Sequence, residues 1–147
     1  MTDEEIYRKN KDDLIRYASV LVGQFEAEDV VSTVVLRILR RRPLEELEEA
    51  RAYLFRAVLN ESRTRLTRSR SISEIGDYDA TPASDPRPEV LVAVMNLPVR
   101  QRAATFLVYW SDLTVQEAAR LMGIRPGTVK RYLFLAKRTL RGVLHDD

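Results

Sequence analysis

The sequence of 147 residues contains no cysteine and a single histidine, His145. The absence of cysteine excludes disulfide bonds and thiolate metal sites. One histidine in a tail, followed by two aspartates, provides no cluster of nucleophiles, general bases or metal ligands. We therefore expect no catalytic residue, no metal and no cofactor, and an enzyme is the least favoured class of protein.

Long apolar runs are also missing. No stretch approaches the ~18 consecutive apolar residues that a membrane span requires. The four residues after Met1 are polar and mostly acidic, unlike the start of a signal peptide. We therefore expect a cytoplasmic protein that makes no membrane contact.

Positive charge is present, and it is concentrated in two segments. The net charge is only +2, but residues 99–144 carry nine Arg or Lys against two acidic residues. Residues 51–70 carry six Arg against one Glu, and an acidic stretch with Ser and Pro lies between the two segments. This distribution indicates two contact points on a polyanion, with solvated charged faces as the plainer interpretation.

Helix-period patterns recur along the chain and strand alternation is absent, so we predict an all-α fold. Residues 71–88 contain serines, prolines and a glycine without sustained periodicity, which is the composition of a flexible linker. We predict two small helical modules, residues 1–70 and 89–147, joined by this linker. The predicted helices cover residues 14–22, 27–41, 50–70, 89–96, 98–110, 115–122 and 126–144.

The sharpest local pattern spans residues 114–131. Thr114 and Glu117 fit a capping box, in which each side chain satisfies a free backbone N–H at the helix start. Gly123 suits the end of that helix, where a left-handed conformation costs glycine least. Pro126 suits the first turn of the next helix. We interpret this segment as a helix-turn-helix, and a plain helical hairpin with a charged exterior is the alternative.

The second helix of this motif has two faces. Apolar residues at steps of three and four predict a buried stripe that comprises Val129, Leu133, Ala136, Leu140 and Val143. Residues near the start of such a helix enter the major groove, and later basic residues reach phosphates. The predicted DNA contacts are Arg125, Thr128, Lys130, Arg131, Phe134, Lys137 and Arg138.

The helix over residues 27–41 also has two faces. Its core face is predicted to comprise Ala27, Val30, Val31, Val34, Val35 and Ile38. On the opposite side, two leucines stand among polar and charged residues, which indicates a protein-docking surface. Singly exposed leucines are normal, and this is the alternative interpretation. The predicted docking residues are Asp29, Ser32, Leu36, Leu39 and Arg40.

The helix over residues 50–70 combines an aromatic ring, arginines and short polar side chains on one face. Aromatic rings stack on unpaired bases and arginines hold phosphates, so this face suits single-stranded or melting DNA. An ordinary solvated face is the alternative. The inner face is predicted to comprise Leu54, Phe55, Val58, Leu59, Ser62 and Leu66. The predicted DNA contacts are Tyr53, Arg56, Asn60, Arg63, Thr64 and Thr67.

With these residues the chain resembles the extracytoplasmic-function (group 4) sigma factors of the bacterial sigma-70 family. Residues 27–31 with Leu36 and Arg37 look like the region 2.2 signature, and residues 51–70 look like regions 2.3 and 2.4. Residues 97–102 resemble the start of region 4, and residues 127–130 its −35 reading helix. The resemblance covers nearly the whole chain in family order.

The resemblance implies an alternative sigma factor that directs bacterial core RNA polymerase to specific promoters and initiates transcription. The first module would dock on the β′ clamp helices through the docking residues above and Thr33. Ser32 and Thr33 stand where the family often has Gln-Glu. Its third helix would read the −10 element and capture a flipped base. The second module would contact the β flap and read the −35 element, with Gly127 joining the DNA contacts above. An anti-sigma factor would be a further partner.

Two other functions are compatible with parts of the pattern. A helix-turn-helix repressor or activator would use the Leu36 and Leu39 patch for dimerisation and would bind its operator without polymerase. A helical adaptor that sequesters another regulator would need no DNA contacts, but the outward Arg and Asn residues are present.

Overall fold

The computed structural model describes residues 1–73 and 88–145, and every regular element within them is helical. The all-α prediction is therefore confirmed for the described part of the chain. None of these helices combines the length and the apolar character needed to cross a membrane. The elements are α1 (Asp3–Val22), α2 (Gln24–Leu39), η1 (Leu44–Glu46), α3 (Ala50–Ser73), α4 (Pro88–Met95), α5 (Val99–Thr105), η2 (Phe106–Trp110), α6 (Val115–Met122) and α7 (Pro126–His145).

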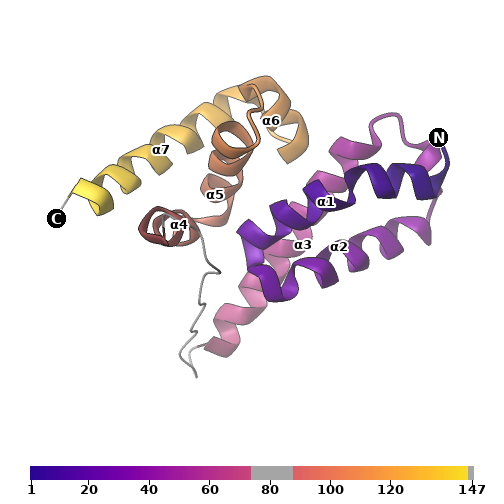
Figure 1. Ribbon diagram of the computed structural model, residues 1–147, viewed down its shortest axis with the longest axis horizontal. Helices are drawn as coiled ribbons and strands as arrows, with labels where there is room; N and C mark the ends of the chain where they lie inside the picture. Colours follow the sequence, from indigo (N-terminus) through magenta and orange to yellow (C-terminus); the bar gives the residue numbers. More distant parts are fainter. Residues whose placement is uncertain (74–87, 146–147) are drawn as a thin grey trace.

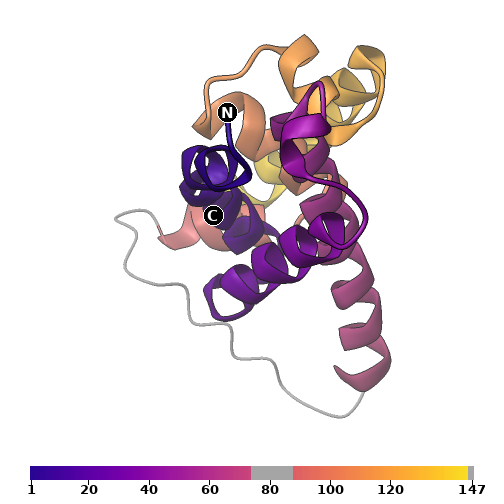
Figure 2. The same cartoon turned by 90° about the vertical axis from the view of Figure 1, so that its right-hand side faces the viewer.

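Helices α1, α2 and α3 form the N-terminal unit, with α1 and α2 packed side by side (Figures 1 and 2). The Thr2 hydroxyl caps α1 by accepting from the Glu5 N–H at 3.2 Å. Gly23, at φ +93°, makes the sharp turn from α1 into α2, a conformation that favours glycine. Helix α2 ends at Leu39 rather than 41, and the single-turn η1 begins after Pro43.

Helices α4 to α7 and η2 form the C-terminal unit. The predicted capping box is confirmed, because the Thr114 hydroxyl accepts from the Glu117 N–H and the Glu117 carboxylate accepts from the Thr114 N–H. Gly123 ends α6 in the left-handed conformation, and α7 starts at Pro126. The predicted helix over 98–110 is α5 continued by the π-helical turn η2.

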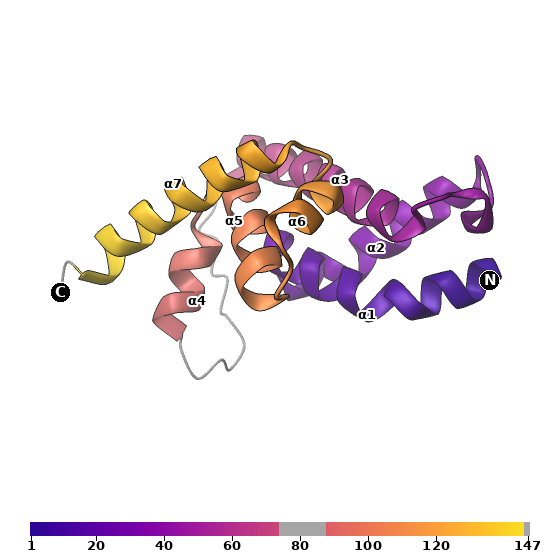
Figure 3. The same cartoon turned by 90° about the horizontal axis from the view of Figure 1, so that it is seen from above.

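Most of the predicted core faces are confirmed. All six predicted core residues of α2 are buried, as are Leu54, Phe55, Val58, Leu59 and Ser62 of α3. The prediction of a buried Val143 is wrong, since this side chain is exposed. It lies beyond the point where α4 covers α7, because the small cluster between these two helices reaches only Leu140 (Figure 3).

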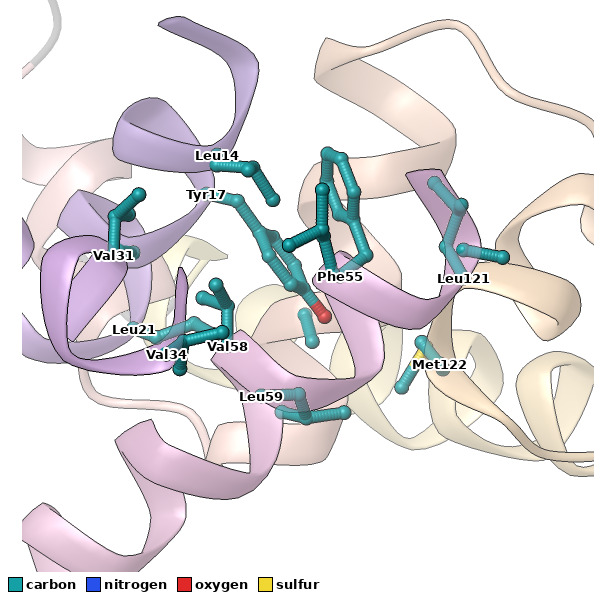
Figure 4. Packing of buried hydrophobic residues seen from close by; sticks show 14 of the residues in the cluster. Leu14, Tyr17, Leu21, Val31, Val34, Phe55, Val58, Leu59, Leu121 and Met122 are labelled. Carbon is teal, nitrogen blue, oxygen red and sulfur yellow. The ribbon is translucent and has the colours of Figure 1, made fainter. Parts of the chain in front are cut away.

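The two units share one core. The ring of Tyr17 of α1 lies between that of Phe55 of α3, tilted to it at a centroid distance of 5.0 Å, and that of Phe106 of η2, stacked on it at 6.2 Å. Leu121 and Met122 of α6 belong to the same buried cluster (Figure 4). The sequence predicted two tethered modules, whereas the structure packs them against each other. Helix α3 also runs to Ser73, past the predicted start of the linker at residue 71, and residues 74–87 lie outside the described residues.

Candidate nucleic-acid and protein interfaces

The outer face of α7 carries the residues predicted to read double-stranded DNA. Because Val129 and Ala136 are buried against the rest of the unit, the opposite side of the helix faces solvent. Among the described residues, no hydrogen bond or ion pair involves the charged groups of this face. All but one of the predicted contacts are exposed, and Thr128 is half-buried: Arg125, Gly127, Thr128, Lys130, Arg131, Phe134, Lys137 and Arg138.

Helices α2 and α3 enclose a basic pocket with a cavity of about 330 Å³. Three of the residues predicted for single-stranded DNA, Tyr53, Arg56 and Asn60, line it from α3. The opposite wall adds Arg37 of α2 together with Arg41 and Arg42 from the turn after α2, and the sequence analysis did not assign these three residues to DNA. A ring, an amide and four guanidinium groups around one cavity can hold a base together with its phosphates.

The other three residues of the α3 prediction lie further along the helix and do not line the pocket. Thr64 and Thr67 are exposed, and their hydroxyls donate to the carbonyls of Asn60 and Arg63 in the preceding turn at 3.0 and 2.9 Å. The side chain of Arg63 is half-buried. The structure therefore brings three of the six predicted residues together in one cavity and leaves three outside it.

A charged seam joins α2 to the inner side of α3. Glu61 is only 7% exposed and forms ion pairs with Arg65 at 3.0 Å and Arg37 at 3.1 Å. Burial by itself raises the pKa of the Glu61 carboxyl, but the hydrogen bonds and charges of the two arginines outweigh it and hold that pKa below its ordinary value. Arg65 also reaches Asp29 at 2.7 Å and the Thr33 hydroxyl at 3.2 Å. The seam fixes α2 and α3 relative to each other.

The outer face of α2 carries the predicted docking residues. Asp29, Ser32, Leu36, Leu39 and Arg40 are exposed, and Thr33 is half-buried. Asp29 and Thr33 also contact Arg65 of α3. The sequence analysis missed Phe25, whose ring is fully exposed. It precedes Leu36 by eleven residues, which at 100° per residue places the two within about 20° of each other around the helix. A helical wheel begun at residue 25 would have found it.

No group of three or more acidic or histidine side chains in residues 1–73 and 88–145 is arranged to hold a metal ion.

The chain is similar to known proteins over almost its whole length. Residues 6–72 match the family described as Sigma-70 region 2, and residues 87–140 match Sigma-70, region 4. The RNA polymerase sigma-E factor of Streptomyces coelicolor is 31% identical, covering 94% of this chain and 83% of that protein. The ECF RNA polymerase sigma factor SigL of Mycobacterium tuberculosis is 30% identical, covering 96% and 88%.

A solved structure has the same fold. The sigma factor RpoE, in its complex with the anti-sigma factor NepR from Bartonella quintana, superimposes with a TM-score of 0.72 at 22% identity, over 98% of this chain and 97% of that one. With the two family regions in order and relatives about 30% identical over most of both chains, this protein belongs to the sigma-70 family of RNA polymerase sigma factors, which are transcription initiation factors and not enzymes.

Proposed function

We propose that this chain is an extracytoplasmic-function (group 4) sigma factor that carries core RNA polymerase to promoters in the bacterial cytoplasm. The observation that carries the proposal is the basic pocket between α2 and α3, in which Tyr53 and Asn60 stand among four arginines. A repressor that reads only duplex DNA has no use for such a pocket, because paired bases stay inside the helix. An opened strand presents bases that the pocket can accept.

The two DNA-binding faces have different tasks in this proposal. The outer face of α7 reads the −35 element as a duplex, with Thr128, Lys130 and Arg131 near the start of the helix closest to the base edges. The pocket and the outer face of α3 bind the opened strand at −10. Because they bind unpaired bases and not the closed duplex, binding shifts the equilibrium toward the melted promoter.

The outer face of α2 is the proposed polymerase contact. Phe25, Leu36 and Leu39 are exposed within about 60° of one another around the helix and form an interrupted apolar stripe. Ser32 lies between Phe25 and Leu36, and Arg40 lies to one side. An apolar centre with a polar and charged border is the usual make-up of a protein interface. The partner in this proposal is the pair of clamp helices of the β′ subunit, with the β flap contacting the C-terminal unit. An anti-sigma factor would compete for these surfaces.

The polymerase contact is tested by Leu36→Glu combined with Arg40→Glu. These changes put charge into the apolar stripe and reverse the charge beside it, so we expect co-purification with core polymerase to be lost while helicity is retained. Lys9→Glu on the exposed side of α1 is the matched control and should co-purify normally. If the double variant still co-purifies as the wild type does, the α2 face is not the contact.

The function itself is tested by run-off transcription with purified core polymerase over a set of genomic promoters. We expect initiation from a subset of promoters only when the chain is added. A chain that binds DNA tightly by itself and never stimulates polymerase would instead be a helix-turn-helix repressor or activator.

A further inference from the structure

The four arginines of the basic pocket do not have the same electrostatic surroundings. The Arg37 guanidinium forms an ion pair with Glu61 at 3.1 Å, and the other oxygen of that carboxylate lies 3.0 Å from Arg65. Arg65 in turn forms an ion pair with Asp29 at 2.7 Å. Two acidic and two basic side chains therefore form one chain of ion pairs without net charge. Arg37 lines the pocket with its positive charge already compensated.

The other three arginines of the pocket have no such acidic partner. The side chains of Arg41 and Arg42 form no hydrogen bond or ion pair with any residue of the described ranges 1–73 and 88–145. Arg56 donates through Nε to the Arg120 carbonyl at 2.9 Å, but this acceptor is neutral and leaves the charge in place. None of the described residues that line the pocket is acidic. The pocket therefore presents three uncompensated positive charges beside one compensated charge.

The compensation changes what Arg37 can bind. An arginine gains affinity for a phosphate through its charge and through the release of counterions, and the carboxylate of Glu61 beside it opposes both. The N–H donors of the guanidinium remain, in a rigid planar fork. Because Glu61 is only 7% exposed and is bound to Arg65 as well, it holds this fork in one orientation. A compensated and oriented fork suits the uncharged edge of a base, which is the kind of contact that specifies sequence.

The rest of the cavity suits a base next to this fork. Val34, Ile38 and Ala57 line it with apolar groups, which fit the face of a base better than a phosphate. A fork with two parallel donors needs two adjacent acceptors on the base. Guanine presents O6 and N7, and a cytosine that is no longer paired presents N3 and O2. Adenine and thymine present no such pair of acceptors.

We propose that Arg37 is the specificity-determining residue of the basic pocket and reads an unpaired guanine or cytosine, while Arg41 and Arg42 hold the phosphates of the strand. Glu61 is the positioning residue that orients Arg37 and compensates its charge. The proposal rests on the proposed function and names the class of base that the pocket accepts. A strand of any sequence is bound through its backbone, and a strand with guanine or cytosine in the pocket is bound more tightly.

The first test compares two variants that remove the same charge from the same pocket. The probes are fluorescent oligothymidines about ten nucleotides long with one central guanine, cytosine, adenine or thymine, bound to the full chain at several salt concentrations. We expect the wild type to bind the guanine probe, the cytosine probe or both at least about fivefold more tightly than the other probes. Arg37→Gln should remove this preference and leave the slope of log affinity against log salt unchanged. Arg42→Gln should keep the preference and reduce the slope by about 0.7.

Arg37→Lys separates the planar fork from the charge and guards against a loss of folding. Lysine keeps a positive charge beside Glu61 but has no fork, so we expect the preference to be lost at an unchanged slope. Equal binding of all four probes by the wild type would overturn the proposal. So would a preference that survives in both Arg37 variants, or a slope that Arg37→Gln reduces as far as Arg42→Gln does.

The second test is a double-mutant cycle between Glu61 and Arg37 on the same probes. Glu61→Gln leaves the charge of Arg37 uncompensated, so we expect the salt slope to steepen by about 0.7 and the base preference to fall. In a chain that already carries Arg37→Gln, the same change should alter neither quantity. Equal changes in both backgrounds would mean that Glu61 acts on the fold alone and would refute its positioning role. Failure of the sigma-factor function has a separate sign, which is the absence of transcription by the unmodified chain on every promoter.

Discussion

The outer faces of α3 and α7 are both basic and both face away from a buried apolar stripe, but their side chains are in different states. The charged groups of α7 make no hydrogen bond or ion pair within residues 1–73 and 88–145. On α3, Arg56 is bound to a carbonyl of the other unit, and the hydroxyls of Thr64 and Thr67 are bound to their own helix.

The two faces therefore differ in the contacts within the protein that must break before their side chains can bind DNA. The α7 face can meet a phosphate or a base edge with no contact inside the protein to break. On the α3 face, Arg56 already donates to the Arg120 carbonyl, so the proposed contact between Arg56 and DNA would first have to break this hydrogen bond.

The largest expected effect is a loss of transcription when two residues on the outer face of α7 are changed. Lys130→Ala with Arg131→Ala removes two of the proposed base contacts near the start of α7, and a good bidentate contact to a base contributes about 1–3 kcal/mol of discrimination. We expect run-off transcription from promoters that require a −35 element to fall at least tenfold, since about 1.4 kcal/mol is a factor of ten. Lys9→Ala with Lys11→Ala on α1 controls for the loss of charge. An equal loss at promoters without that element would mean that the two residues contact phosphates only.

A smaller effect is expected on the binding of single-stranded DNA when Tyr53, on the outer face of α3, is changed. Tyr53 is 41% exposed at the pocket, and stacking of one base on an aromatic ring contributes about 1–3 kcal/mol. We expect Tyr53→Ala to weaken binding of a single-stranded oligonucleotide about five- to a hundredfold and Tyr53→Phe to leave it almost unchanged. Loss of binding in both variants would assign the effect to the hydroxyl and contradict stacking.

The ion pairs of Glu61 in the charged seam stabilise the packing of α3, and their contribution to the free energy of unfolding depends on pH. Within the described residues, no such ion pair lies beneath the outer face of α7. The pKa of Glu61 is lower in the folded protein than its ordinary value of 4.5, so its ion pairs stabilise the fold above about pH 4.5 and are lost as the pH falls through the lowered pKa. We expect Glu61→Gln to reduce the free energy of unfolding at pH 7 by about 2 kcal/mol. As the pH falls below 4.5, urea unfolding should show that the variant loses less stability than the wild type. Glu28→Gln, an exposed carboxylate on α2, should keep the wild-type slope.

The same comparison shows which features the sequence could predict. The helix-turn-helix was predictable from Thr114, Glu117, Gly123 and Pro126, because capping and turn chemistry involve residues close in the chain. The pocket was predictable only on its α3 side, since Arg41 and Arg42 join it through the packing of α2 against α3.

The contact between the two units was not predictable from local patterns. Arg56 and Arg120 are 64 residues apart, and Arg102 and Leu21 are 81 apart, so no helical period links them. Val143 was predicted to be buried because it continues the periodic stripe of α7, but the helix extends past the residues that cover it. Periodicity identifies the side of a helix that can be buried, and tertiary packing decides how much of that side is covered.

The smallest expected effect is a change in stability when Tyr17, in the core shared by the N-terminal and C-terminal units, is replaced. Tyr17 is fully buried between Phe55 and Phe106, and its hydroxyl finds no hydrogen-bond partner among the described residues. An unpaired buried hydroxyl costs about 1–3 kcal/mol, whereas both ring contacts survive its removal. We expect Tyr17→Phe to raise the free energy of unfolding in urea by about 1 kcal/mol. A loss of stability would show that the Tyr17 hydroxyl is hydrogen-bonded in solution. The contact between the two units would then depend on a buried hydrogen bond in addition to its apolar packing.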